Sequence, residues 1–258
     1  MKLKQLSALC LAASVLTAAP AMAWESADGQ FNTSASVALS TDYMWRGSSQ
    51  TDNEPAISGS FDVNHASGFY AGAWASNTDK MVMQTNLSFE QGHIEINGYA
   101  GYANEVGDTG IGYDVGFKRY FFPGTDGQAD WNEAYAALNY SHFGLKISHT
   151  EDFNATHEEA THYLLTFNHA LPMGAHFHAG YAFYDFDDID DVFGTTPNNI
   201  DNPLQDFGVG VSKDFAGFNW DVTYYETLKE GKDATENNNA GSDNKADSRF
   251  VLTISKSL

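Results

Sequence analysis

Apolar and polar residues alternate along most of this chain, and few stretches show the spacing of an amphipathic helix. In the segment 34–45, one face would carry Ala35, Val37, Leu39, Thr41, Tyr43 and Trp45, and the other Ser34, Ser36, Ala38, Ser40 and Asp42. The same period of two recurs in 57–64, 111–118, 176–183 and 218–225. A period of two is typical of β-strands with one apolar and one polar face. The pattern therefore predicts an all-β chain, either a soluble sandwich or a barrel.

The lengths of the connections distinguish between these two folds. Long polar links, such as 47–54 and 186–203, alternate with short ones, such as 66–68 and 214–217. Short turns at one end and long loops at the other are typical of bacterial transmembrane barrels. We therefore predict an all-β, antiparallel up-and-down transmembrane β-barrel of about 12 strands, with short periplasmic turns, long extracellular loops and both termini in the periplasm. A soluble exported barrel stays open as an alternative.

One segment leaves the strand count open. Met81, Met83, Leu87 and Phe89 also alternate with polar residues, and a spanning strand at Met81–Glu90 would make the count odd. Single-chain bacterial barrels have an even number of strands. We therefore place this segment in a tall hairpin above the membrane.

The N-terminus predicts export. Lys2 and Lys4 precede an apolar stretch that ends in Ala21-Met22-Ala23, the small-residue pattern of a cleavage site. This is the layout of a secretory signal peptide. We therefore predict that residues 1–23 are removed and that residues 24–258 form a single outer-membrane barrel domain. Cys10 is the only cysteine and would leave with the signal, which excludes disulfides and thiolate metal sites from the mature chain.

Charge and composition narrow the class of protein further. The formal net charge is −21 at pH 7, and phosphate recognition needs a basic surface, so nucleic acid is excluded as a partner. Aromatic residues make up 14% of the chain, which suits a barrel whose outer band faces lipid. The last segment, Arg249–Leu258, alternates and ends on an apolar residue, as outer-membrane strands do. We expect outer-membrane lipid, lipopolysaccharide and the barrel-assembly machinery as partners.

Several blocks of sequence carry a family resemblance. They are STDYMWRGSSQTDNEPAISGSFDV at Ser40–Val63, GFYAGAWASN at Gly68–Asn77, GYAGYANEVGDTGIGYDVGFKRYFFPG at Gly98–Gly124, TEDF at Thr150–Phe153 and SKSL at Ser255–Leu258. Together they resemble the TorF-type family of proteobacterial outer-membrane porins over nearly the whole mature chain. The resemblance implies an outer-membrane porin but specifies no solute.

The polar face of the strands contains the candidate pore-lining residues. Carboxylates outnumber basic groups on this face, and the candidates are Asp42, Asp62, Glu95, Asp114 and Asp221, with Lys118, Lys146 and Arg249 as the bases. An acidic, water-filled lumen favours cations by the same charge logic that acts in channel filters. We therefore predict a cation-leaning porin for the passive diffusion of small polar solutes. The alternative is that these charges pair with one another and close a narrow barrel.

Arg46 is a candidate for the pore mouth. It follows Trp45 at the predicted top of the first strand, where an aromatic ring suits the membrane interface. Its guanidinium would be placed to bind an anionic group of a solute. A structural ion pair or a contact with a lipopolysaccharide phosphate is the alternative, which we favour.

The remaining candidates do not form a catalytic or metal site. The acidic stretch with Asp185, Asp187, Asp188, Asp190 and Asp191 lacks the spacing of a calcium loop. His162, His176 and His178 do not make three converging zinc ligands. His149 lies on an apolar face, as in a lipid hydrolase, but the spacing assigns it no serine or acid partner. We predict no enzyme, no catalytic residue, no metal and no cofactor; a lipid-modifying enzyme and a closed barrel with a structural or surface-interaction role are the alternative functions.

Overall fold

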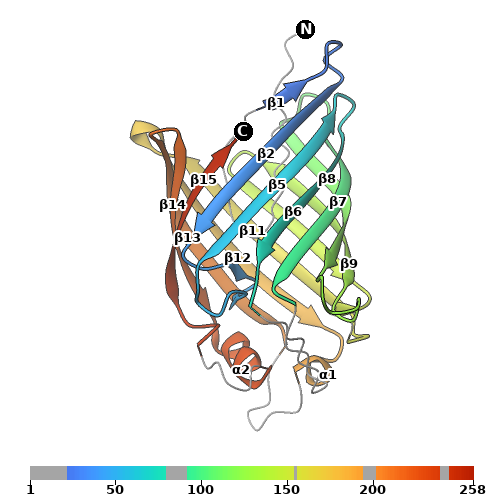
Figure 1. Ribbon diagram of the computed structural model, residues 1–258, viewed down its shortest axis with the longest axis vertical. Helices are drawn as coiled ribbons and strands as arrows, with labels where there is room; N and C mark the ends of the chain where they lie inside the picture. The colour runs from blue at the N-terminus through green and yellow to red at the C-terminus, as the bar shows by residue number, and fades with distance from the viewer. Residues whose placement is uncertain (1–21, 80–91, 154–155, 194–201, 239–243) are drawn as a thin grey trace.

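The computed structural model is a closed antiparallel β-barrel (Figure 1), and it describes residues 22–79, 92–153, 156–193, 202–238 and 244–258. The wall is a ring of strands in chain order, closed where β2 pairs with both β15 and β5. These strands are β2 (Phe31–Ser40), β5 (Ala56–His65), β6 (Phe69–Asn77), β7 (Ile94–Glu105), β8 (Ile111–Phe121), β9 (Trp131–Tyr140), β10 (Phe143–Thr150), β11 (Ala160–Ala170), β12 (Ala175–Phe186), β13 (Leu204–Phe215), β14 (Phe218–Thr227) and β15 (Arg249–Ser257). The predicted number of 12 wall strands is thus confirmed.

The smaller elements lie at the two ends or inside the ring. They are β1 (Met22–Glu25), β3 (Met44–Trp45), β4 (Ser48–Ser49), the 3₁₀ turn η2 (Pro172–Gly174), α1 (Ile189–Phe193) and α2 (Lys229–Asn238). Strand β1 is an extra strand that pairs with β2 alone. Both described ends of the chain lie at the end with the short turns, and α1 and α2 lie at the opposite end (Figure 1). Met81–Glu90, where a further strand was considered, lies outside the described residues.

The short turns are tight hairpins. Strands β13 and β14 are joined by Ala216 and Gly217, whose φ angles of 55° and 81° are both positive. Two-residue hairpins need such angles so that the turn matches the twist of the strands. The other end of the barrel instead carries the longer links, as the sequence predicted.

The outer face of the wall is apolar. Exposed aliphatic and aromatic side chains recur on it at every second position, as in Val37 and Leu39 on β2 and in Val115 and Phe117 on β8. A contiguous band of this size is unfavourable in water, whereas lipid is its natural solvent. No helix within the described residues is long and apolar enough to cross a membrane.

The inner face is polar and contains a repeated packing device. Tyr99 lies across the wall above Gly72 and donates a hydrogen bond to Asp62 Oδ1 at 2.5 Å. A Cβ at Gly72 would lie 2.6 Å from both Asp62 Oδ1 and Tyr99 Cε2. Tyr70, above Gly101, likewise donates to Asp114 at 2.6 Å. These glycines let phenol rings lie flat against the wall, so that the rings occupy less of the lumen.

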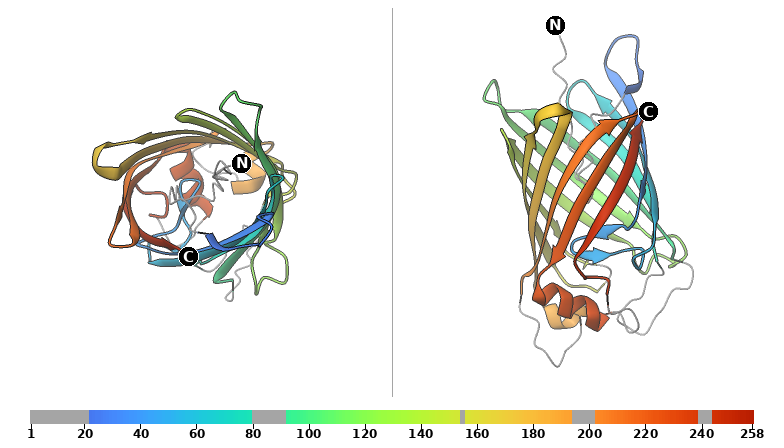
Figure 2. Two further views of the ribbon diagram at one scale, coloured as in Figure 1. Left: turned by 90° about the horizontal axis from the view of Figure 1, so that it is seen from above. Right: turned by 90° about the vertical axis from the view of Figure 1, so that its left-hand side faces the viewer.

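The first wall strand corrects the sequence prediction. We expected it to extend to Trp45, but β2 ends at Ser40 and residues 41–55 turn into the lumen, where β3 and β4 form a small hairpin (Figure 2). Tyr43 and Met44 are buried there, and Trp45 is half-buried among other rings instead of facing the membrane interface. We call residues 41–55 the infolded segment.

Two polar stretches are also more ordered than the sequence indicates. Asp185 belongs to β12, and the acidic stretch continues into α1. The first part of the polar link after β14 forms α2, where Lys229 Nζ lies 3.0 Å from Asp233 Oδ2 one turn later. This hydrogen bond raises the pKa of Lys229 above its ordinary value. Such a pair between positions i and i+4 stabilises an otherwise polar helix.

Candidate functional site

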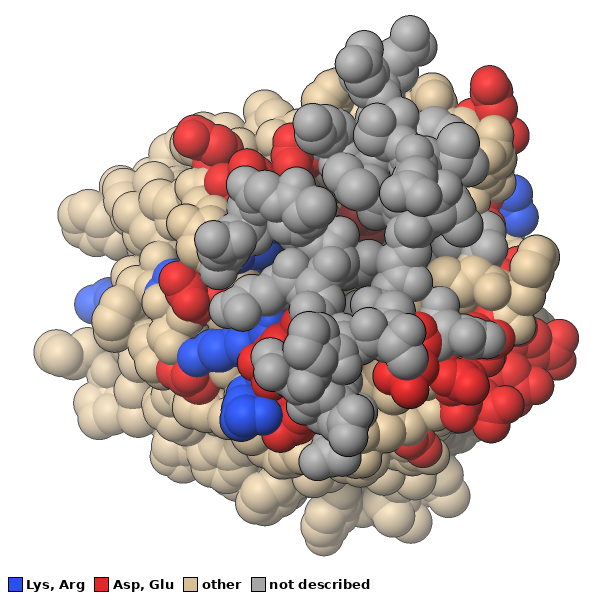
Figure 3. Space-filling model, turned by 90° about the horizontal axis from the view of Figure 1, so that it is seen from below, with Lys and Arg blue, Asp and Glu red and all other residues tan. Residues whose placement is uncertain are grey.

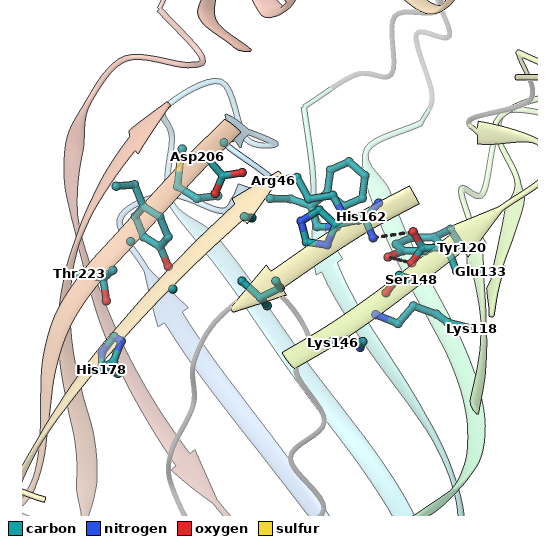
Figure 4. Close-up of a pocket in the computed structure, with 18 residues that line it drawn as sticks. Arg46, Lys118, Tyr120, Glu133, Lys146, Ser148, His162, His178, Asp206 and Thr223 are labelled. Atoms are coloured by element: carbon teal, nitrogen blue, oxygen red, sulfur yellow. Dashed lines mark hydrogen bonds and ion pairs between the residues drawn. The ribbon is translucent and has the colours of Figure 1, made fainter. Parts of the chain in front are cut away.

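A cavity of about 110 Å³ lies inside the barrel beside the infolded segment (Figure 4). Its wall comes from β8 to β14, and its end is formed by residues 44–47 of the infolded segment. Charged groups that line it include Arg46, Lys118, Lys146, Glu133 and Asp206. The candidate site is therefore a narrowed stretch of the lumen, and not a pocket on the outer surface.

Polar contacts hold the base of the infolded segment. Asp42 is buried and accepts hydrogen bonds from Ser49 Oγ at 2.6 Å and from Thr51 Oγ1 at 2.9 Å. Arg249, on β15, forms an ion pair with Asp42, with 2.6 Å between its Nη1 and Asp42 Oδ2. A buried carboxylate is tolerated when it is paired and hydrogen-bonded in this way. Asp42 therefore fixes the segment to the last wall strand and does not stand free in the lumen.

Arg46 holds the tip of the infolded segment. Its φ is 47° and that of Gly47 is 82°, so the chain makes a tight reversal between β3 and β4. Arg46 Nη2 lies 2.5 Å from Glu133 Oε1 on β9, and both side chains are buried. Although burial alone would lower it, the Glu133 carboxylate raises the pKa of Arg46 above its ordinary value. The tip is thus tied to the opposite part of the wall.

An aromatic cluster surrounds this ion pair. The guanidinium of Arg46 lies 4.5 Å from the ring centroids of both Trp45 and Tyr184, and such cation–π contacts are favourable when desolvated. Tyr120 and Trp131 stack with centroids 4.1 Å apart, and Tyr120 Oη donates to Glu133 at 2.9 Å. The cluster fills the lumen on one side of the infolded segment at the end with the long loops.

The predicted pore-lining carboxylates all occupy inward positions. Most accept hydrogen bonds from neutral neighbours: Tyr99 and Ser60 donate to Asp62, Tyr70 to Asp114, Tyr43 and Asn97 to Glu95, and Thr223 to Asp221, while His178 Nε2 lies 2.6 Å from Asp221 Oδ2. These contacts orient each carboxylate along the wall. Burial, and after it the Glu95 carboxylate, raises the pKa of Tyr43 in the infolded segment well above its ordinary value.

The two predicted lysines lie beside each other in the cavity. Lys118 Nζ is 5.2 Å from the ring centroid of Tyr120, and Lys146 Nζ is 4.2 Å from that of Tyr135. Both line the cavity together with Arg46 (Figure 4). The structure thus brings Lys118, Lys146 and Arg46 together. Asp114 lies level with Lys146, since both are opposite Ala137 of β9, and Asp62 lies farther along the wall on β5. Arg46 itself is inside the lumen and not at the top of a strand, because its segment folds inward.

Sequence reasoning missed several residues of this site. Glu133 and Asp206 lie on inward positions of β9 and β13, where strict alternation from Trp131 and from Leu204 would have placed them. His162, considered from the sequence only as a zinc ligand, lines the cavity through the same alternation on β11. The signal for these residues was thus present in the pattern. No pattern in the sequence indicates that Arg46 meets Glu133.

The histidines form neither of the alternative sites in the described part of the chain. No group of three or more His, Cys, Asp or Glu side chains among these residues is arranged to hold a metal ion. His149 is on the outer face, and its Nδ1 lies 2.9 Å from Thr161 Oγ1. The register places Asp185 next to Thr161 and not next to His149. A hydrolytic triad needs the acid behind the histidine, which this order does not provide.

Comparisons with solved structures show the same barrel architecture. The NanC porin is 10% identical, with a TM-score of 0.51 over 86% of this chain and 97% of that one. An outer membrane channel from Pseudomonas putida F1 is 9% identical, with a TM-score of 0.47 over 87% and 94%. Outer membrane phospholipase A from Escherichia coli is 10% identical, with a TM-score of 0.41 over 87% and 91%. No curated protein matches the sequence.

The closed ring of strands and its apolar outer face are those of an outer-membrane barrel, and the NanC porin shares this architecture. At such low identity the comparisons show the architecture alone. A family model described as "Bacterial protein of unknown function (Gcw_chp)" matches residues 24–258, which is the entire barrel. The chain belongs to this bacterial family.

Proposed function

We propose that this protein is a narrow outer-membrane porin for the passive diffusion of small polar solutes, and that it favours cations. The observation that carries the proposal is the cavity beside the infolded segment, which is lined by charged groups and is left open by the side chains around it. A lumen built only for stability would be filled with interdigitating side chains. The infolded segment narrows the passage and so sets the size of the solute.

The preference for cations is supported by how the inward charges are paired. Arg46 and Arg249 neutralise Glu133 and Asp42. The inward carboxylates outside these two pairs include Asp62, Glu95 and Asp114, which accept hydrogen bonds mainly from neutral hydroxyl, phenol and amide groups. Together with Asp206 and Asp221 they outnumber the two inward lysines, Lys118 and Lys146. Negative charge along a low-dielectric wall raises the local concentration of cations. At the end of the barrel with the long loops, acidic side chains gather most densely on one side, and Lys and Arg lie on another (Figure 3).

The mature form belongs to the same proposal. We infer that residues 1–23 are a signal peptide and that 24–258 are the exported barrel, which agrees with a family match that begins at residue 24. The kinship to TorF-type porins, with lipopolysaccharide and the barrel-assembly machinery as partners, is likewise inferred from the sequence blocks.

A closed barrel is the second candidate function. It is favoured by one observation: the infolded segment is tied to the wall at both Asp42 and Arg46 and is packed into an aromatic cluster. If this seal is complete, the loops would be the working part of the molecule. A lipid-modifying enzyme is less well supported, because His149 and Asp185 flank Thr161 on opposite sides.

Single-channel recording in planar bilayers tests the proposal. With a potassium chloride gradient, we expect discrete conductance steps and a reversal potential directed to cations, which weakens as salt screens the wall charges. Asp62→Asn should reduce this preference, because it removes a negative charge from the lumen. Asp185→Asn is the matched control, since this exposed residue faces outward on β12. Folded, inserted protein without conductance would contradict the proposal and support the closed barrel.

A further inference from the structure

Basic side chains gather on one side of the cavity. Lys118 on β8 and Lys146 on β10 lie next to the Arg46–Glu133 pair (Figure 4). Glu133 is already engaged by Arg46 and by the hydroxyl of Tyr120. Three basic groups and one carboxylate therefore line this side of the cavity, while Glu95 and Asp114 lie nearby on the wall outside the lining.

Two buried polar atoms beside these lysines have no hydrogen-bond partner among the described residues: His162 Nε2 and Arg46 Nη1. His162 is 7% exposed and lines the cavity, as Arg46 does. Buried nitrogens of this kind are rarely left without a partner, and each exception calls for an explanation. Both groups can donate a hydrogen bond, so an acceptor that enters the cavity would satisfy them.

The opposite side of the cavity leaves room for such an acceptor. It is lined by the small residues Gly180, Ala182 and Gly208 of β12 and β13. Asp206 of β13 lies opposite Ala182 of β12 in the strand ladder and lines the same side of the cavity. Its carboxylate repels an anion, so an anionic group is directed toward β8 and β10.

We propose that this cavity is a binding subsite for the carboxylate of a small organic acid, held by Lys118 and Lys146 with His162 and Ser148 as flanking polar groups. The inference rests on the proposed function, because the acid reaches the cavity through an open lumen. Inorganic cations are drawn by the acidic parts of the wall, whereas the organic anion is retained only here. The subsite therefore gives the pore a solute preference that its net charge alone would not provide.

Gluconate and sorbitol are the probes that test this inference. They share a six-carbon polyhydroxy chain and differ in the carboxylate, so a difference between them reports the charge. Titration calorimetry on the refolded protein in detergent should show binding of gluconate and not of sorbitol. The double variant Lys118→Gln/Lys146→Gln should weaken the binding at least about tenfold, because charge-assisted hydrogen bonds to a carboxylate are lost.

Two further variants keep the test specific. Arg119→Gln is the matched control, because Arg119 is the next residue on β8 and its exposed side chain faces outward, toward Asp130. It should leave gluconate binding unchanged. Lys146→Arg keeps the charge and should retain most of the affinity. Circular dichroism and the heat-dependent gel mobility of each variant confirm that the barrel is folded.

The calorimetric result decides the inference independently of conductance. Gluconate binding that is equal to that of sorbitol, or that is unchanged in the folded double variant, would overturn the subsite. Binding that disappears with the two lysines supports it. Conductance recorded on the same preparation then tests the porin proposal by itself: protein that binds gluconate but does not conduct would contradict the pore and not the subsite.

Discussion

Individual glycines decide how much of the lumen is open. Gly72 lies under the Tyr99–Asp62 hydrogen bond, and Gly101 lies under Tyr70. A ring that lies along the wall needs a neighbour without a Cβ, so tyrosine and glycine act as a pair on adjacent strands. Because of this pairing, the barrel can hold many tyrosine rings on its inner face and still keep an open lumen. The composition alone does not show how both are possible.

Gly72→Ala tests this pairing. The new Cβ would lie 2.6 Å from atoms of both Asp62 and Tyr99, so the Tyr99–Asp62 hydrogen bond should break and the ring should turn into the lumen. We expect a loss of about 1–3 kcal/mol in the free energy of unfolding, since the half-buried Asp62 carboxylate loses one of its two donors and keeps only Ser60. Urea unfolding in lipid vesicles measures it.

Gly98→Ala is the matched control for this substitution. Gly98 is on β7, and a Cβ there would meet nothing within 4 Å. Replacing a strand glycine by alanine at such a position should be neutral or stabilising by about 0.5 kcal/mol. Equal effects of the two substitutions would show that the contact between ring and glycine has no energetic role.

At the scale of elements, the infolded segment distinguishes this barrel from a simple ring of strands, because it lies inside the lumen and narrows it. It is attached by charge at Asp42 and at Arg46, to β15 and β9 respectively. Because each attachment includes a buried carboxylate, removing one arginine leaves a buried charge without its partner. Release of the segment is therefore coupled to the loss of a specific ion pair.

Arg46→Ala should both destabilise the barrel and widen the passage. The single variant leaves Glu133 buried and unneutralised, which costs about 3–5 kcal/mol. Arg46→Ala/Glu133→Gln removes both charges and should recover much of that stability while keeping the larger conductance. Denaturant titration and single-channel recording measure the two effects separately.

Arg119→Ala is the control for the loss of an arginine. Its partner is Asp130, but the Arg119 side chain is 52% exposed, so the change should cost less than about 1 kcal/mol and leave conductance unaltered. If Arg46→Ala behaved in the same way, the infolded segment would not be held by this ion pair.

The sequence predicts the wall better than it predicts this segment. A period of two places each wall residue inward or outward, so the inward positions of Asp62, Asp114 and Lys118 follow from the pattern. The pattern continues without a break through Thr41, Tyr43 and Trp45, and so it hides the end of β2 at Ser40. The partner that makes Asp42 tolerable inside the lumen is Arg249, more than 200 residues away along the chain. Contacts at that separation leave no local signal.

At the scale of the whole molecule, the two faces of one wall meet two solvents. The outer face carries exposed residues such as Val209 and Val211 on β13, whereas Ser212, between Val211 and Lys213, is buried inside. Lipid on one side and water on the other make the alternation obligatory along every strand. A net charge of −21 is compatible with a membrane protein when charged side chains lie in the lumen, as Asp62 and Asp114 do, or at the ends of the barrel, as α2 does.

If the outer face lies in the membrane, the free-energy cost of placing a charge on it should depend on the depth of the substituted residue. Val209 lies near the middle of β13 and Phe215 at its last residue, and both face outward. Val209→Arg should cost about 2–4 kcal/mol, because it places a cation near the bilayer midplane, whereas Phe215→Arg should cost about 0–1 kcal/mol from charge at the interface. Guanidinium titration of both variants refolded in vesicles measures the difference. In detergent micelles, which adapt to the cation more easily, the two values should approach each other. A soluble barrel would show no such dependence on depth in either medium, so equal costs in vesicles would contradict the transmembrane position of this strand.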